Sequence, residues 1–207
     1  MNNNNILAVV LAGGQAKRFG KDKSQVRLGK LTLIDHVLSK IVDEFTEILI
    51  VSNKDIKFMS SDKITLIEDY VKDMGPLGGV LSAMKWVIKK DKKYKWIMTF
   101  PSDTPFFNKS IINEFSKKIK LNDSFLYFVK ANQKRHNIFG LWSLSLLKKL
   151  EDDLINKKEN KVELWANKIG VKTINLEFDQ FDPFFNINTI EDLEKAKRIL
   201  GKKDDRL

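Results

Sequence analysis

The chain has 207 residues, with 37 Lys and Arg against 27 Asp and Glu and a formal net charge of +10. A hydrophobic fraction of 43% excludes general disorder, and the lack of cysteine excludes disulfides, thiolate zinc sites and cysteine nucleophiles. No apolar run reaches the roughly 18 residues of a membrane-spanning helix, and the N-terminus lacks the features of a secretion signal. We therefore expect a cytoplasmic protein without a membrane partner.

The basic excess is compatible with nucleic-acid binding, with a polyanionic small substrate, or with an ordinary solvated surface. Only five of the basic residues are arginines, the residue that base reading and bidentate phosphate recognition favour. The lysines are scattered, and several stand where helices are expected to end. These features favour a lysine-rich surface, and no nucleic-acid partner is expected.

Hydrophobic patterns divide the chain into alternating strands and helices. The apolar run Ile6–Leu11 ends at two glycines and predicts a strand buried on both faces. Further strands are predicted at 48–51, 64–67, 96–100, 125–129, 138–142 and 171–176. Helices are predicted at 34–45, 76–88, 111–119, 144–155 and 162–169, with a last helix that starts at Thr189.

This order predicts a single α/β domain spanning residues 1–207, three-layered and Rossmann-like, with a mostly parallel sheet. The two strands predicted at 125–129 and 138–142 flank a polar turn and are typical of a hairpin. We therefore expect one antiparallel strand in the second half of the sheet.

Polar or small residues follow four predicted strands, and ligands of open α/β sheets bind at the carboxyl ends of the strands. In the first loop, Ala12, Gly13 and Gly14 allow close approach to the backbone, and the cations of Arg18, Lys21 and Lys23 match a triphosphate. The loop is neither a Walker A loop nor a dinucleotide fingerprint. The alternative is a glycine turn with solvated charges.

Motifs at these strand ends carry a resemblance that covers nearly the whole chain. In chain order they are Leu11-Ala12-Gly13-Gly14-x-x-x-Arg18-x-Gly20-x-Asp22-Lys23, Asn53, Asp69, Gly75-Pro76-Leu77-Gly78-Gly79, Asp103-Thr104-Pro105 and Phe185-Asn186-Ile187-Asn188-Thr189. Together they resemble the molybdenum cofactor guanylyltransferases, within the broader nucleotidyltransferase family. The sequence departs from the usual pattern at Phe19, Gly78 and Asn137.

The resemblance implies a role for each matching residue. Residues 6–120 would form the nucleotide-binding part and 121–200 the acceptor-binding part. Asp103 would hold Mg²⁺, and Arg18, Lys23 and Asp103 would be catalytic. The residues implied to bind nucleotide are Leu11, Ala12, Gly13, Gly14, Lys23, Asn53, Asp69 and Asp103, and those implied to bind the acceptor are Arg135, His136, Asn186 and Asn188.

The function so implied is transfer of GMP from GTP to the terminal phosphate of molybdenum-molybdopterin. The resemblance also implies transient contact with other cofactor-biosynthesis proteins or molybdoenzymes. The chemistry needs alignment, a hard carboxylate for Mg²⁺ and cations for the leaving pyrophosphate. Two alternatives remain open: a nucleotidyltransferase that uses CTP or acts on a sugar or alcohol phosphate, and a non-catalytic module that binds GTP or RNA.

Several of these residues also have plain structural interpretations. Asp103 is a suitable cap for a following helix, and Asn186 and Asn188 are common turn formers. His36 is expected to be structural, and His136 adjoins Arg135 in a turn where it could contact phosphate. The four tryptophans, Trp86, Trp96, Trp142 and Trp165, are expected in the core.

Overall fold

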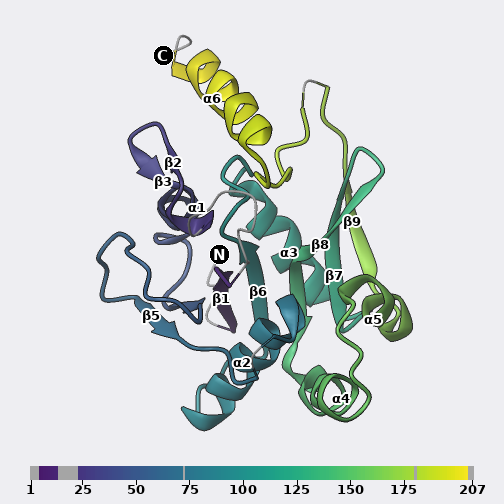
Figure 1. Ribbon diagram of the computed structural model, residues 1–207. Coiled ribbons are helices and arrows are strands. Elements are labelled where there is room, and N and C mark those ends of the chain that lie inside the picture. The colour runs from purple at the N-terminus through teal and green to yellow at the C-terminus, as the bar shows by residue number, and fades with distance from the viewer. Residues whose placement is uncertain (1–4, 14–22, 72, 180, 205–207) are drawn as a thin grey trace.

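The computed structural model describes residues 5–13, 23–71, 73–179 and 181–204. A seven-stranded sheet runs through the molecule in the order β5-β4-β1-β6-β8-β7-β9. Its strands are β1 (Ile6–Leu11), β4 (Ile48–Val51), β5 (Ile64–Ile67), β6 (Trp96–Pro101), β7 (Leu126–Ala131), β8 (Lys134–Ser143) and β9 (Lys172–Leu176). Helices cover both faces of the sheet (Figure 1).

Pairing within the sheet confirms the predicted topology. The strands β5, β4, β1 and β6 are parallel neighbours, whereas β8 runs antiparallel to both β6 and β7. The strand β9 then pairs in parallel with β7. The hairpin therefore inserts one antiparallel strand into the sheet, as its polar turn predicted, although β7 and β8 extend closer to the turn than the sequence indicated.

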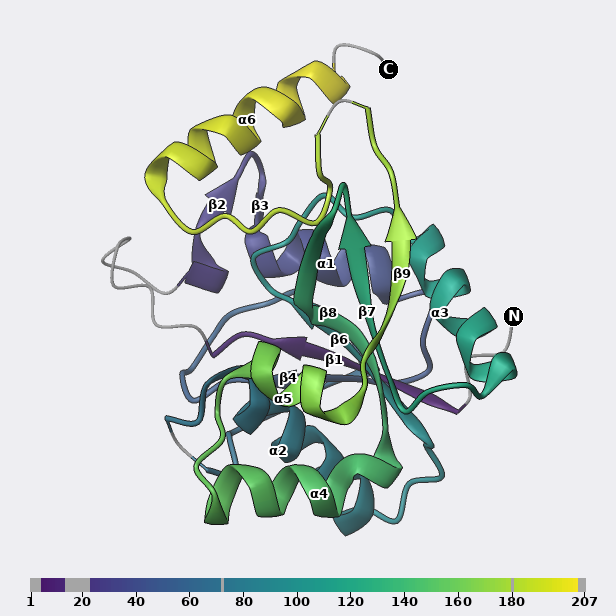
Figure 2. The same ribbon diagram turned by 90° about the vertical axis from the view of Figure 1, so that its right-hand side faces the viewer.

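Alternate residues of the central strands feed two cores, because successive side chains of a strand point to opposite faces. Ala8 and Val10 pack in the core beneath α1 (Leu33–Ile41) and α3 (Ser110–Leu121). Leu7 and Val9 pack in the other, beneath α2 (Gly75–Lys89) and α5 (Val162–Ile169). Figure 2 shows these two helical layers on either side of the sheet.

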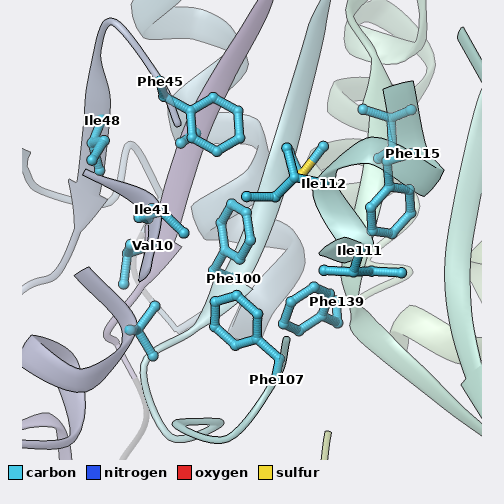
Figure 3. Packing of buried hydrophobic residues seen from close by; sticks show 14 of the residues in the cluster. Val10, Ile41, Phe45, Ile48, Phe100, Phe107, Ile111, Ile112, Phe115 and Phe139 are labelled. Atoms are coloured by element: carbon cyan, nitrogen blue, oxygen red, sulfur yellow. The ribbon is translucent and has the colours of Figure 1, made fainter. Parts of the chain in front are cut away.

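Aromatic rings fill much of the first core (Figure 3). Phe100, Phe107 and Phe139 form a triangle with centroid separations of 5.0–5.5 Å, and Phe45 meets Phe100 edge-on at 6.0 Å. Each buried phenyl side chain contributes roughly 1.5–3 kcal/mol through burial. Phe139 comes from β8, and Phe100 from β6, so this cluster joins the two halves of the chain.

Differences from the predicted elements lie mainly at their ends. The first long helix ends at Ile41, although Phe45 beyond it is buried as the pattern required. The helix predicted at 144–155 is a succession of a 3₁₀ turn (η2, Leu144–Leu146), α4 (Leu147–Glu151) and a π-helical turn (η3, Asp152–Asn156). A 3₁₀ turn (η1, Lys23–Gln25) lies in the region predicted as loop.

The C-terminal helix α6 (Ile190–Asp204) begins as predicted, with a reciprocal cap. Thr189 Oγ1 accepts from the Asp192 amide at 3.1 Å, and Asp192 Oδ2 accepts from the Thr189 amide at 3.0 Å. The helix packs on a small hairpin, β2 (Arg27–Leu28) and β3 (Leu31–Thr32), that the sequence analysis missed. Strands of two residues are too short to show a periodic pattern.

Among the described residues, no helix is long and apolar enough to cross a membrane. Many of the lysines have acidic partners at the surface, such as Lys92 with Glu47 at 3.0 Å and Lys172 with Asp123 at 2.7 Å. These scattered ion pairs agree with the interpretation of the basic excess as a solvated surface.

Candidate active site

A cavity of about 620 Å³ opens at the carboxyl ends of the parallel strands. Each strand from β5 to β6 contributes the residues that follow it, because parallel strands end at the same edge of the sheet. The cavity is lined by Leu11, Ala12, Gly13, Lys23, Ser24, Val51, Asn53, Lys54, Asp69, Asp73, Gly75, Pro76, Gly79, Pro101, Ser102, Asp103, Ile138 and Asn186.

The loop after β1 enters the cavity through its backbone. The Ala12 amide donates to the carbonyl of Val51 at 3.0 Å, so this segment extends the pairing of β1 with β4. Opposite it, Gly79 of α2 lies so near Leu11 that a Cβ at this position would stand 2.8 Å from Leu11 Cδ2. Gly79 therefore packs closely on Leu11, and the N-terminal end of α2, the positive end of its dipole, lines the cavity.

Asn53 and Asp69 form a two-point contact across the ends of β4 and β5. Asn53 Nδ2 donates to Asp69 Oδ2 at 2.9 Å, and the Asp69 amide donates to Asn53 Oδ1 at 2.9 Å. Burial raises the pKa of Asp69, while the side-chain contacts with Asn53 and Ser82 oppose this rise less strongly. The pair presents an oriented carboxylate to the cavity.

Asp103 is the centre of a polar cluster that joins three segments of the chain. Its Oδ1 accepts from Asn186 Nδ2 at 2.8 Å and from Thr104 Oγ1 at 3.2 Å, and its Oδ2 is paired with Lys23 Nζ. Lys23 Nζ also donates to Asn188 Oδ1 at 2.5 Å. Lys23 and Asp103, predicted from separate motifs 80 residues apart, therefore meet in one site.

Aromatic packing and one backbone bond hold the segment of Asn186 and Asn188 against Asp103. The Ile187 amide donates to the Asp103 carbonyl at 3.0 Å, and Ile187 is fully buried. Phe185 stacks on Phe106 with centroids 5.8 Å apart. The two asparagines are thus more than turn formers, because both contact the charged pair.

The structure also excludes the capping interpretation of Asp103. The helix that follows, α3, has Lys109 at its N-cap, six residues beyond Asp103. The carboxylate faces the cavity instead.

Arg135 and His136 line a second, smaller cavity of about 120 Å³ that adjoins the first. The two cavities share Pro101, Ile138 and Asn186. His136 is buried, with Nε2 2.8 Å from Asp182 Oδ2. Burial raises the pKa of Asp182, but the contacts with His136 and the Phe184 amide and the charge of Lys134 together outweigh it, and the net pKa is below its usual value.

Arg135 is held in place by neighbours on β8 and α5. Its Nε donates to Asn137 Oδ1 at 2.6 Å, and its Nη1 donates to Asn167 Oδ1 at 2.7 Å. Three of the predicted acceptor residues, Arg135, His136 and Asn186, therefore line the small cavity, and Asn186 also lines the large one. Asn188 lines neither cavity and contacts Lys23 instead.

Some predicted residues cannot be placed, and some lining residues were not predicted. Gly14 and Arg18 lie outside the described residues. Ile138 lines both cavities. Its sequence context is that of an ordinary strand residue, so the sequence did not predict a role in the site. His36 is structural as expected, with Nε2 2.7 Å from the Leu28 carbonyl oxygen. Trp96, Trp142 and Trp165 are buried in the two cores, whereas Trp86 is partly buried and packs against the second core.

A cavity at strand ends with backbone amides, a charged pair and a helix N-terminus defines a nucleotide-binding α/β fold. Residues 8–167 match the family of MobA-like NTP transferase domains. The chain therefore belongs to this family and is a nucleotidyltransferase.

Relatives support this over most of the chain. It is 30% identical over 194 residues to a molybdenum cofactor guanylyltransferase of Haemophilus influenzae strain 86-028NP, covering 92% of this chain and 97% of that protein. A protein of the same name from Nitrobacter hamburgensis is 27% identical over 193 residues, with 92% of each chain covered.

A solved structure shows the same fold. The crystal structure of molybdopterin-guanine dinucleotide biosynthesis protein A from Archaeoglobus fulgidus aligns with a TM-score of 0.73 at 22% identity, covering 95% of this chain and 99% of that one.

Proposed function

We propose that the protein transfers GMP from GTP to the terminal phosphate of molybdenum-molybdopterin, forming the guanine dinucleotide form of the cofactor and releasing pyrophosphate. The names of its relatives support this activity. The observation that carries it is the joining of two cavities at Asn186, next to the Lys23–Asp103 pair. A reaction between two anionic substrates requires adjoining subsites and shared charge neutralisation.

In this proposal the larger cavity binds the nucleotide. Backbone groups of Leu11, Ala12, Gly13 and Gly14 and the side chains of Asn53 and Asp69 would hold GTP, in a nucleotide-binding part of about residues 6–120. Because the residues after Leu11 in this loop have small side chains or none, their backbone amides can donate hydrogen bonds to phosphate oxygens or to the edge of a base. The remaining part of the single domain, about residues 121–200, would bind the acceptor through Arg135, His136, Asn186 and Asn188.

The residues around Asp103 fit a magnesium ion that is held mainly by substrate phosphates. Among the residues that the structure describes, no group of three or more His, Cys, Asp or Glu side chains could form a complete cage. Magnesium commonly takes one or two carboxylates and completes its coordination with phosphates and water. Asp103, a hard oxygen ligand already oriented by Asn186, matches that requirement.

The transfer step makes one bond and breaks one. An oxygen of the acceptor's terminal phosphate forms a bond to the α-phosphorus of GTP. The bond from the α-phosphorus to the oxygen that links it to the β-phosphorus breaks, and that oxygen leaves with the electron pair as part of pyrophosphate. A bound magnesium ion would neutralise phosphate charge. Lys23 and Arg18 would stabilise the charge that develops on the leaving group. The attacking phosphate is already ionised, so no general base is required.

A pyrophosphate-release assay tests this proposal. The purified protein is given Mg²⁺, molybdenum-molybdopterin and one of GTP, CTP, UTP or ATP in turn. We expect release with GTP alone, and matching thermal stabilisation by GTP. Pyrophosphate release with CTP alone would show that the substrate is CTP and not GTP. Salt-sensitive retention of RNA, with no pyrophosphate release from any nucleotide, would favour a non-catalytic binding module.

We also propose a cytoplasmic location and transient contacts with cofactor-biosynthesis proteins or molybdoenzymes. The contacts are expected because the product of the proposed reaction has to reach the proteins that use it.

A further inference from the structure

The antiparallel strand β8 contains an irregularity next to both cavities. Phe128 of β7 stands opposite Gly140 of β8, but the next residue, Val129, stands opposite His136. Three residues of β8, numbers 137–139, therefore lie between two consecutive pairs. Such a bulge bends its strand and redirects side chains, and bulges are frequent next to active sites.

The neighbouring strand β6 holds this bulge with one buried hydroxyl. Thr99 is fully buried, and its pairing with Gly140 is the last between β6 and β8. Thr99 Oγ1 lies 2.5 Å from the Ile138 carbonyl oxygen and 3.2 Å from that of Gly140. The hydroxyl is thus placed where the regular ladder ends and the bulge begins.

Trp142 determines the direction of the hydroxyl hydrogen bond. Its indole Nε1 lies 2.8 Å from Thr99 Oγ1, and an indole N–H can only donate. Thr99 Oγ1 therefore accepts from Trp142 and directs its own proton to the carbonyls of Ile138, in the bulge, and of Gly140 beside it. A buried carbonyl without a donor would be costly, so this contact stabilises the bulged path over a regular one.

The held segment is part of the wall of both cavities. Ile138, whose carbonyl Thr99 binds, lines the large and the small cavity, and Asn137 and Phe139 line the small one. Gly140, which follows the bulge, packs closely against β7, because a Cβ there would stand 2.4 Å from Phe128 Cδ1. A change at Thr99 therefore acts mainly on the small cavity, because residues 137–139 all line it, whereas only Ile138 also reaches the large one.

We propose that Thr99 is a positioning residue for the acceptor subsite, acting through the β8 bulge at residues 137–139. This inference rests on the proposed function, since it requires that the small cavity receives the acceptor. Thr99 itself lines neither cavity. Its role is to keep Ile138, Asn137 and His136 in the arrangement that admits a phosphate-bearing acceptor.

The test compares Thr99→Val, which keeps the shape but removes the donor, with Thr99→Ser, which restores it. Thr99→Ala removes the donor without placing a methyl group against the carbonyls, and serves if the valine variant does not fold. We expect the KM for molybdenum-molybdopterin to rise about tenfold in the valine and alanine variants, with kcat and the Kd for GTP within about twofold. The serine variant should recover the wild-type KM.

Tyr127→Phe is the matched control. Tyr127 is a buried hydroxyl-bearing residue at the amino end of β7, where its hydroxyl donates to Asp123 Oδ1 at 2.5 Å. Loss of this bond lowers stability without reaching the bulge, so the KM should stay unchanged. Hydrogen exchange gives a second readout: amides 137–139 should exchange faster in Thr99→Val than in the wild type or Tyr127→Phe.

The outcomes separate the two proposals. A wild-type protein that releases no pyrophosphate from GTP and the acceptor contradicts the proposed function and this inference together. An active wild type whose Thr99→Val variant keeps its KM contradicts the role of Thr99 alone. An equal loss of GTP affinity in that variant would show general damage and would also overturn the positioning role.

Discussion

The two sides of the large cavity are built in different ways. The first side comes from the ends of the parallel strands β1, β4 and β5, where Gly13, Asn53 and Asp69 each stand two residues beyond the last residue of a strand. The second side comes from β8 and the segment before α6, where Ile138 and Asn186 are brought in by a bulge and by aromatic packing. The position of the residues on the first side follows from the ends of neighbouring parallel strands, which can be recognised locally in the sequence. The position of the residues on the second side depends on contacts between distant segments.

Asp103 lies where these two sides meet, so its loss should have the largest effect. Asp103→Asn keeps the size of the side chain but removes the charge that pairs with Lys23 and that would hold the metal. We expect pyrophosphate release to fall about a thousandfold, with the melting temperature close to that of the wild type. Full turnover in this variant would contradict the placement of the metal and of the shared centre.

Asp153 offers a comparison with an acidic residue that serves only the fold of the second half. The side chain is fully buried and bonds Lys149 at 2.5 Å, Lys157 at 2.8 Å and Trp165 Nε1 at 3.1 Å. Burial raises the pKa of Asp153, but the lysine contacts outweigh this, and the net pKa lies below its usual value. Its stabilising contribution is present above the ordinary carboxyl pKa and is lost as the pH falls toward the lowered one.

Asp153→Asn should therefore lower the free energy of unfolding at neutral pH by about 3 kcal/mol, as measured by urea denaturation. The kcat per folded molecule should not change. A matching loss of turnover would mean that α4, η3 and α5 influence the site.

Asp69 tests the parallel side alone. Asp69→Asn should weaken GTP binding about tenfold and leave the KM for the acceptor unchanged, because the ionised carboxylate is the acceptor of hydrogen bonds in this part of the cavity. Since burial raises the pKa of Asp69, GTP binding by the wild type should weaken as the pH falls, starting above the ordinary carboxyl range. Titration calorimetry at a series of pH values measures the Kd for GTP of the wild type and of Asp69→Asn. If the variant showed the same weakening of GTP binding at low pH, Asp69 would not be the group responsible.

Arg135 tests the opposite side, with the smallest expected change. Arg135→Gln retains a donor for Asn137 or Asn167 but removes the charge. The KM for the acceptor should rise roughly fivefold, and this rise should shrink at high salt, because a partly exposed charge is screened. The Kd for GTP should stay constant. Equal changes in both constants would remove the distinction between the two sides.

The site was predictable from sequence to the extent that it follows strand ends. The residues Ala12, Gly13, Asn53, Asp69 and Asp103 each stand immediately after or just beyond an apolar run, and the end of a buried strand is visible locally. The β8 bulge was not predictable, because residues 138–142 form an ordinary apolar pattern. Neither was the hairpin of β2 and β3, whose two-residue strands take their stability from α6.

The sequence by itself determined the mostly parallel sheet, the order of its elements, and the family to which the motifs belong. These features depend on periodicity and on residues close together in the chain. The tertiary structure alone decided that Lys23 and Asp103 pair, that Asn186 and Asn188 join them, and that Thr99 holds the bulge. Each of these contacts joins residues tens of positions apart, and no local pattern records which distant donor will satisfy a buried acceptor.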